Sequence, residues 1–167
     1  MGIRLGVGLV AAVGLLAGCG GGQEAAPASQ VSPASALSAS TTTAEAVQSA
    51  SAAARALNVP SVVKVVDLTE DTDPNNLIGR PNGYTAASVI YDSGASCVSL
   101  GVSCGATVEQ WATPADAQRR ADSIQQILTA SPVLGSEYHS VRGPLLLRAS
   151  GKLKSSVWAT YQAAFVK

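Results

Sequence analysis

The residues best suited to chemistry lie in one polar segment, residues 70–84, where carboxylates, amides and a guanidinium are interspersed with glycines and prolines. Asp71, Asp73 and Asn75 stand at alternate positions, as the first oxygen ligands of a calcium-binding loop do. The later positions depart from that pattern, because such a loop needs glycine at its sixth position and glutamate at its twelfth, and this chain has asparagine at both. We therefore expect no metal in this segment.

Two interpretations of the segment remain. In the first it is a structural turn, in which Asp and Asn side chains cap the backbone and Arg80 pairs with Asp71 or Asp73. In the second it is a recognition surface, because ordered loops on a rigid scaffold often carry binding. The candidate recognition residues are Asp71, Asp73, Asn75, Arg80 and Tyr84.

Cys19 suggests chemistry of another kind, because it directly follows an apolar run. Residues 5–17 are apolar and a basic residue precedes them, as in a secretory signal, and the run is shorter than the ~20 residues of a membrane-spanning helix. The motif Leu16-Ala17-Gly18-Cys19 resembles the lipobox of bacterial lipoproteins. In that family the cysteine sulfur receives a diacylglycerol and cleavage falls before the cysteine. The resemblance implies that Cys19 is lipidated and becomes the first residue of the mature chain.

Cys97 and Cys104 are then left as a pair in an oxidising, exported setting, where we expect them to form a disulfide. Closing so short a loop stabilises a fold by roughly 2–3 kcal/mol. A zinc site needs four ligands, and the spacing of these two thiols is not the two-residue spacing of redox or zinc motifs. We expect neither a metal nor a cofactor.

Charge and the remaining titratable residues limit the function further. Eleven Lys and Arg balance eleven Asp and Glu with no basic run, which argues against nucleic acid as a partner. His139 is the only histidine, and no Gly-x-Ser-x-Gly motif marks a nucleophile beside it. Asp92 and Glu109 are carboxylates on expected strands, and we expect them to be solvated rather than paired as acid and base.

The polar segment carries a second resemblance. Its Asp-Pro-Asn, Gly-Arg-Pro and Gly-Tyr steps are similar to a segment of uncharacterised small lipoproteins and exported proteins of Gram-positive bacteria, especially actinobacteria. The similarity extends over residues 62–165. That group has no assigned activity, so the resemblance implies export and anchoring and supplies no catalytic residues.

The chain divides into four parts. Residues 1–18 are the expected signal peptide, and residues 19–42 are the lipidated cysteine with a tether of Ala, Ser, Thr and Pro that has too few large apolar side chains to order itself. Residues 43–58 predict a short Ala-rich helix that starts at a Thr-Thr-Ala-Glu capping box and docks weakly on the domain or belongs to the tether. Residues 59–167 form the expected globular domain.

Within that domain, β-branched and aromatic residues bounded by turn signals predict three strands. Cys97 and Cys104 lie between the second and the third. A helix follows, begun by Thr113 and Pro114, then a hairpin or one bent strand, then an amphipathic terminal helix. The expected ranges are 61–68, 84–91 and 107–111 for the strands, 114–130 for the helix, 138–148 for the hairpin and 152–166 for the last helix. The fold class is α+β, a two-layer sandwich of four to five antiparallel strands with two to three helices on one face.

Together these features predict a lipid-anchored protein on the extracytoplasmic face of the cell membrane that binds a cell-envelope partner and is not an enzyme. One alternative is a carrier of a small or lipidic ligand, although the few large apolar side chains argue against a deep cavity. The other alternative is a cell-envelope hydrolase, which needs a nucleophile with a base or two carboxylates with shifted pKa values.

Overall fold

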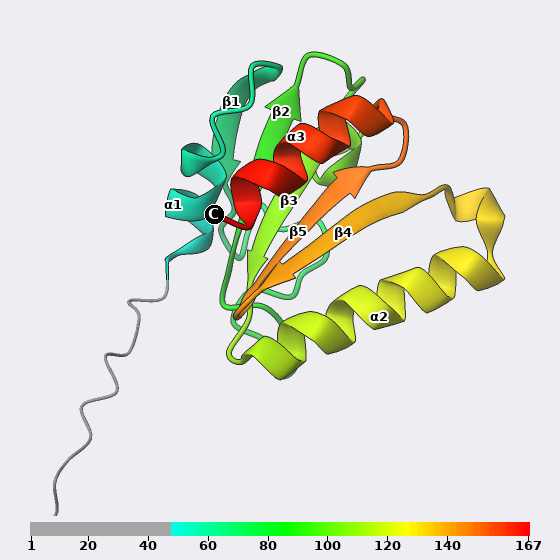
Figure 1. Ribbon diagram of the computed structural model, residues 1–167. Coiled ribbons are helices and arrows are strands. Elements are labelled where there is room, and N and C mark those ends of the chain that lie inside the picture. Colours follow the sequence, from blue (N-terminus) through cyan, green and yellow to red (C-terminus); the bar gives the residue numbers. More distant parts are fainter. Residues whose placement is uncertain (1–47) are drawn as a thin grey trace, which may run out of the picture. The chain divides into compact units, whose positions relative to one another are not determined.

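The computed structural model of the chain describes residues 48–167, which belong to one compact unit (Figure 1). The expected signal peptide, the lipidation of Cys19 and the tether at residues 19–42 lie outside the described residues.

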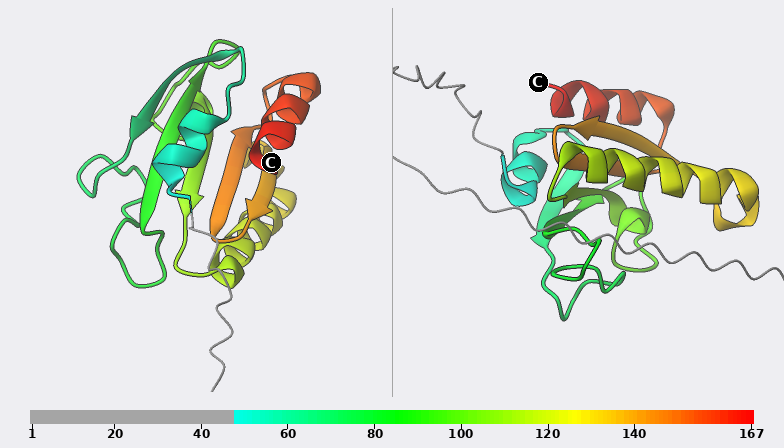
Figure 2. Two further views of the ribbon diagram at one scale, coloured as in Figure 1. Left: turned by 60° about the vertical axis from the view of Figure 1, so that its left-hand side comes forward. Right: turned by 90° about the horizontal axis from the view of Figure 1, so that it is seen from below.

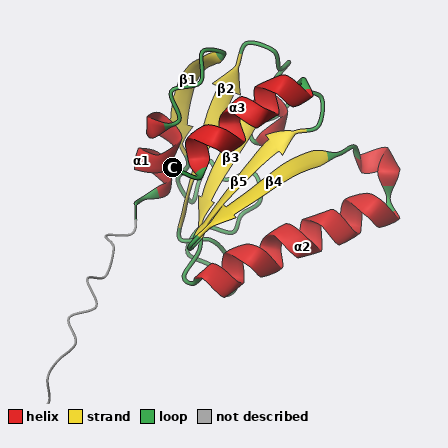
Figure 3. Ribbon diagram, viewed as in Figure 1, coloured by secondary structure: helices red, strands yellow, loops and turns green. Residues whose placement is uncertain are grey.

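A five-stranded antiparallel sheet forms the centre of the domain, in the order β1-β2-β3-β5-β4 (Figure 3). The first three strands are sequential neighbours, and β4 and β5 form a hairpin that follows the long helix. The α+β class and the three predicted strands are confirmed, and of the two possibilities for residues 138–148 the hairpin is correct. The strands are β1 (Val62–Asp67), β2 (Ala86–Asp92), β3 (Gly105–Gln110), β4 (Glu137–Arg142) and β5 (Leu145–Ser150).

Three helices accompany the sheet, α1 (Ala50–Ala56), α2 (Pro114–Ala130) and α3 (Ser155–Phe165). Helix α2 has the predicted bounds, because the Thr113 hydroxyl accepts a hydrogen bond from the Asp116 N–H and proline occupies the first turn. Along α3, Tyr161 and Phe165 are buried at the predicted spacing. Short 3-10 turns precede β3 and β4, at Val102–Cys104 and Pro132–Leu134.

The helices cover both faces of the sheet, so the expectation that they share one face is wrong. Helices α1 and α3 pack on the face that carries Leu145 and Leu147, whereas Ala117 and Ala121 of α2 pack against Leu146 on the other (Figure 2). The reason lies in β5, where three consecutive leucines alternate between the faces and all six residues are buried. A strand that is apolar on both faces needs cover on both.

Helix α1 is part of the core and does not dock weakly as expected. It begins at Ala50, where the Ser49 hydroxyl accepts a hydrogen bond from the Ala52 N–H, and the capping box predicted near residue 43 lies outside the described residues. Three of its alanines, Ala50, Ala53 and Ala54, are 1–2% exposed, and Leu57, which follows the helix, is 3% exposed. Short side chains let the helix approach the sheet closely, so a thin apolar stripe still packs densely.

Candidate functional site

The polar segment is an ordered loop organised around the carboxylate of Asp73, which is 7% exposed. Its oxygens accept hydrogen bonds from the N–H groups of Asn75 (3.0 Å), Leu77 (2.7 Å) and Ile78 (3.0 Å) and from the Tyr84 hydroxyl. Burial alone would raise the pKa of Asp73, but these hydrogen bonds, that of Tyr84 foremost, outweigh it and lower the pKa. The oxygens of Asp73 are therefore engaged within the loop itself.

Backbone geometry explains why asparagine and glycine stand in this loop. Asn76 and Asn82 adopt left-handed conformations, with φ of 50° and 62°, which asparagine tolerates better than most residues. At Gly83 an added Cβ would lie 2.0 Å from the carbonyl oxygen of Leu77, so this close approach requires glycine. The asparagines that break the calcium pattern serve the turns of the loop.

Arg80 does not pair with Asp71 or Asp73, so that part of the first interpretation is wrong. Its guanidinium donates to the side-chain oxygen of Asn76 at 2.9 Å, because Asp73 turns inward and is already bonded there. The Asn75 amide donates to the Tyr84 hydroxyl at 3.2 Å. Of the five candidate recognition residues, Asp73, Asn75 and Tyr84 are joined by hydrogen bonds within the loop, whereas Asp71 and Arg80 are exposed and take no part in these bonds.

The loop forms one wall of a groove of about 670 Å³, and the first turns of α2 form the other. We call this the loop–helix groove. Arg80 and Tyr84 line it from the loop, and Arg119 and Arg120 line it from α2. Trp111 also lines the groove, with its ring edge-to-face to that of Tyr84 and the centroids 5.8 Å apart. The volume falls within the roughly 300–1,000 Å³ of small-molecule sites.

The loop–helix groove is positively charged, since its lining includes three arginines and one carboxylate, Asp116. Asp116 is already bonded to Arg119 and to the Thr113 hydroxyl. Arg120 lies 3.7 Å from Glu109, and its Nε atom is buried without a hydrogen-bond partner. Arg80, by contrast, is bonded only to the neutral Asn76 side chain, so the lining as a whole carries more positive than negative charge.

A buried ion network lies behind Arg120. Glu109, 2% exposed, accepts hydrogen bonds from the Trp111 indole N–H (3.2 Å) and from Arg148 (2.6 Å). Arg148 also donates to both oxygens of Glu137, at 2.9 Å each, and the His139 ring lies 3.2 Å from Glu137. One guanidinium therefore holds two carboxylates between β3, β4 and β5.

The network shifts the pKa values of Glu137 and Arg148. Burial alone would raise the pKa of Glu137, but hydrogen bonds from His139 and Arg148 and the charge of Arg148 outweigh it and lower the pKa to about 2. Burial alone would lower the pKa of Arg148, but Glu137 and Glu109 raise it. Glu137 is consequently ionised at neutral pH and cannot act there as a general acid.

Asp92 and Glu109 lie on opposite faces of the sheet and cannot act as a pair. Asp92 is 4% exposed on the α3 face and accepts hydrogen bonds from the hydroxyls of Tyr161 (2.9 Å) and Ser61 (2.5 Å). Both carboxylates are buried, so the expectation that they are solvated is wrong. Each lies at a strand position that faces a packed helix.

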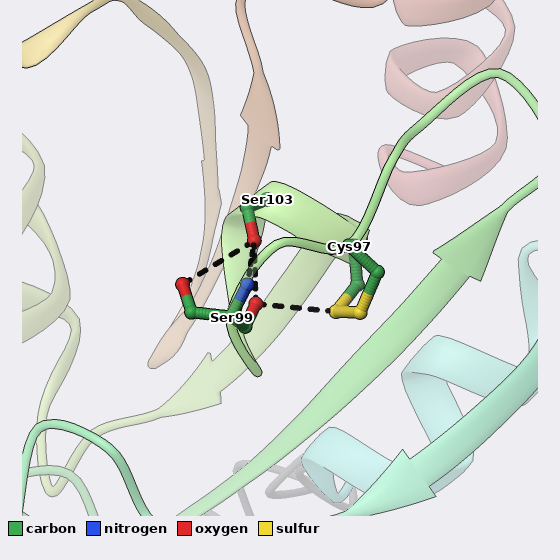
Figure 4. The surroundings of a disulfide bond; sticks show 4 residues. Cys97, Ser99 and Ser103 are labelled. Carbon is green, nitrogen blue, oxygen red and sulfur yellow. Dashed lines mark hydrogen bonds between the residues drawn. A yellow bond between two sulfur atoms is a disulfide. The ribbon is translucent and has the colours of Figure 1, made fainter.

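The sulfur atoms of Cys97 and Cys104 lie at disulfide distance in the connection between β2 and β3, as predicted (Figure 4). Next to the disulfide, the Ser99 N–H donates to the Ser103 hydroxyl oxygen at 3.1 Å, and the Ser103 hydroxyl donates back to the Ser99 carbonyl. The pair closes a small turn and takes no part in the loop–helix groove.

A larger groove, of about 1250 Å³, lies between α1, α3 and the β4–β5 turn. Small side chains such as Ala56 and Ala163 line much of it. Arg142, also in its lining, donates to Gln48 at 2.6 Å and stands 5.0 Å from the centre of the Phe165 ring. None of the candidate recognition residues lies there.

Within residues 48–167, no helix has the length and apolar character to cross a membrane. In the same part of the chain, no group of three or more His, Cys, Asp or Glu side chains is placed to hold a metal ion. Comparison of the whole chain with protein-family models, curated proteins and solved structures gave no match.

Proposed function

We propose that this chain is a lipid-anchored protein of the extracytoplasmic face of the cell membrane that binds a cell-envelope partner in the loop–helix groove, without catalysis. The supporting observation is that the loop singled out by its composition is ordered around Asp73 and forms one wall of that groove. The lipobox resemblance at Cys19 supports the proposed location at the membrane.

An ordered wall favours binding on physical grounds. Because Asp73 already holds the loop through backbone hydrogen bonds, a ligand loses little affinity to ordering it. The lining also combines aromatic and arginine side chains, here Tyr84, Trp111 and the arginines, which are the residues that dominate binding energy at protein interfaces. These properties suit recognition.

The proposed anchor predicts that Cys19→Ser abolishes membrane retention and leaves the folded domain unchanged. Each buried acyl methylene contributes about 0.8 kcal/mol, so two or more chains retain a protein stably and their loss releases it. Membrane fractionation after signal cleavage measures the change. Retention of the serine variant in the membrane fraction, or the absence of lipid on wild-type Cys19 by mass spectrometry, would contradict the anchor.

Blocking the groove tests the binding. Ala112 is exposed and lines the loop–helix groove, so Ala112→Trp fills it without altering charge. Ala159→Trp places the same bulk on the exposed side of α3 as a control. Both variants carry Cys19→Ser, so that acyl chains add nothing to binding. We expect Ala112→Trp alone to bind isolated cell envelopes at least about tenfold more weakly, since a filled groove loses its contacts.

A further inference from the structure

We propose that the loop–helix groove binds a phosphate monoester and that Arg80, Arg119 and Arg120 hold its oxygens. This inference rests on the proposed function, because it names the ligand class of the same groove.

The charge of the lining selects the class of anion. The lining carries three guanidinium groups and the single carboxylate of Asp116, and the Glu109 carboxylate behind Arg120 is shared with Arg148, so positive charge is in excess. A phosphate monoester carries about −1.5 to −2 charges at pH 7, whereas a simple carboxylate carries one. The phosphate therefore suits this positive lining better than a carboxylate does, and it offers three acceptor oxygens to the three guanidinium groups.

The arginines come from both walls, so they can contact one phosphate from two sides. Arg80 extends from the loop, and Arg119 and Arg120 extend from α2. The planar fork of a guanidinium suits two phosphate oxygens at once. The present partner of Arg80 is the neutral Asn76 amide, and the pair of Arg119 with Asp116 leaves the Arg119 side chain 70% exposed. Exposed pairs of this kind are weak and exchange readily for a ligand.

Arg120 lies deeper than the other two, with 23% of its side chain exposed. Its Nε atom faces Glu109 at 3.7 Å, beyond hydrogen-bond distance, and Glu109 is already bonded to Arg148 and Trp111. A buried donor without an acceptor costs free energy. Glu109 thus acts as a positioning residue, which holds Arg120 by charge while the guanidinium remains available on the groove side.

Titration calorimetry of the full-length protein in non-ionic detergent, at low salt and pH 7.5, tests the inference with inorganic phosphate as the probe. We expect wild type to bind phosphate, and Arg80→Gln/Arg119→Gln to bind it at least tenfold more weakly. Lys152→Gln/Lys154→Gln removes the same charge from exposed positions that do not line the groove and should bind as wild type does. Glycerol phosphate and dihexanoyl phosphatidic acid then distinguish a soluble phosphate ester from a lipid headgroup.

The inference would be overturned by a lack of phosphate binding in wild type, or by equal weakening in the two double variants. Tighter binding of acetate than of phosphate would do the same. The proposed function is tested separately by Ala112→Trp, which is neutral. If that variant loses envelope binding while Arg80→Gln/Arg119→Gln retains it, the groove is the binding site and the phosphate assignment is wrong.

Discussion

Replacing Arg148 with methionine is expected to lower the free energy of unfolding by roughly 3–5 kcal/mol, because it leaves the buried carboxylate of Glu109 and the half-buried one of Glu137 without their shared cation. Arg148 is 9% exposed and bonds to Glu109 and Glu137. Urea denaturation measures the change. Arg119→Met, at a side chain that is 70% exposed, is the matched control and should cost no more than about 1 kcal/mol.

Replacing all three charged residues of the network with apolar ones tests whether the loss comes from unpaired charge or from altered packing. Arg148→Met combined with Glu109→Leu and Glu137→Leu should recover part of the loss, because apolar residues often replace a buried ion network at little cost. The pH dependence of the free energy of unfolding provides a second test of the network. The pKa of Glu137 falls from 4.5 to about 2 on folding, so its stabilisation is complete above pH 4.5 and disappears as the pH falls toward 2. Equal stabilities of Arg148→Met and Arg119→Met would contradict the account of the network.

Replacing Asp73 with asparagine should release the loop, at a cost of about 1–3 kcal/mol for hydrogen bonds that its carboxylate alone can satisfy. Three backbone N–H groups and the Tyr84 hydroxyl donate to it, and an amide offers one acceptor oxygen in place of two. Hydrogen exchange at Leu77 and Ile78 should accelerate while α2 stays protected.

The control for Asp73 is Asp71→Asn, an exposed position in the same loop, which should leave exchange unchanged. Arg80→Ala should also have less effect than Asp73→Asn, because Arg80 supports the loop only through Asn76. Fast exchange of Leu77 and Ile78 in the wild type would show that the loop is not ordered, and the groove would then lose one wall.

Local patterns in the sequence predict most elements of the fold because their signals are local. Thr113 and Pro114 mark the start of α2, and β-branched runs mark β1 to β3. The prediction placed the helices on one face of the sheet, whereas they cover both. The consecutive leucines of β5 are a signal for a strand that is buried on both sides. Helix α1 begins at Ala50 because Ser49 caps it, and a single serine among many in this stretch is a weak signal in the sequence.

The candidate site was predictable only in part. Composition identified the loop, but its partner wall depends on tertiary packing that brings Arg119 and Arg120 of α2 to it. The buried network joins residues from three strands, so spacing along the chain could not reveal it. The available signals were single charges in apolar strands, Glu109 beside Val108 and Arg148 after three leucines.

Envelope binding by the blocked-groove variant tests the central claim most directly. Wild type, Ala112→Trp and Ala159→Trp, all lipid-free through Cys19→Ser, are mixed over a concentration range with envelopes from cells lacking the protein, and the sedimented fraction is measured. The account predicts saturable binding by wild type and Ala159→Trp, with affinity at least about tenfold lower for Ala112→Trp. Unchanged binding by Ala112→Trp would contradict it and would direct attention to the larger groove between α1 and α3.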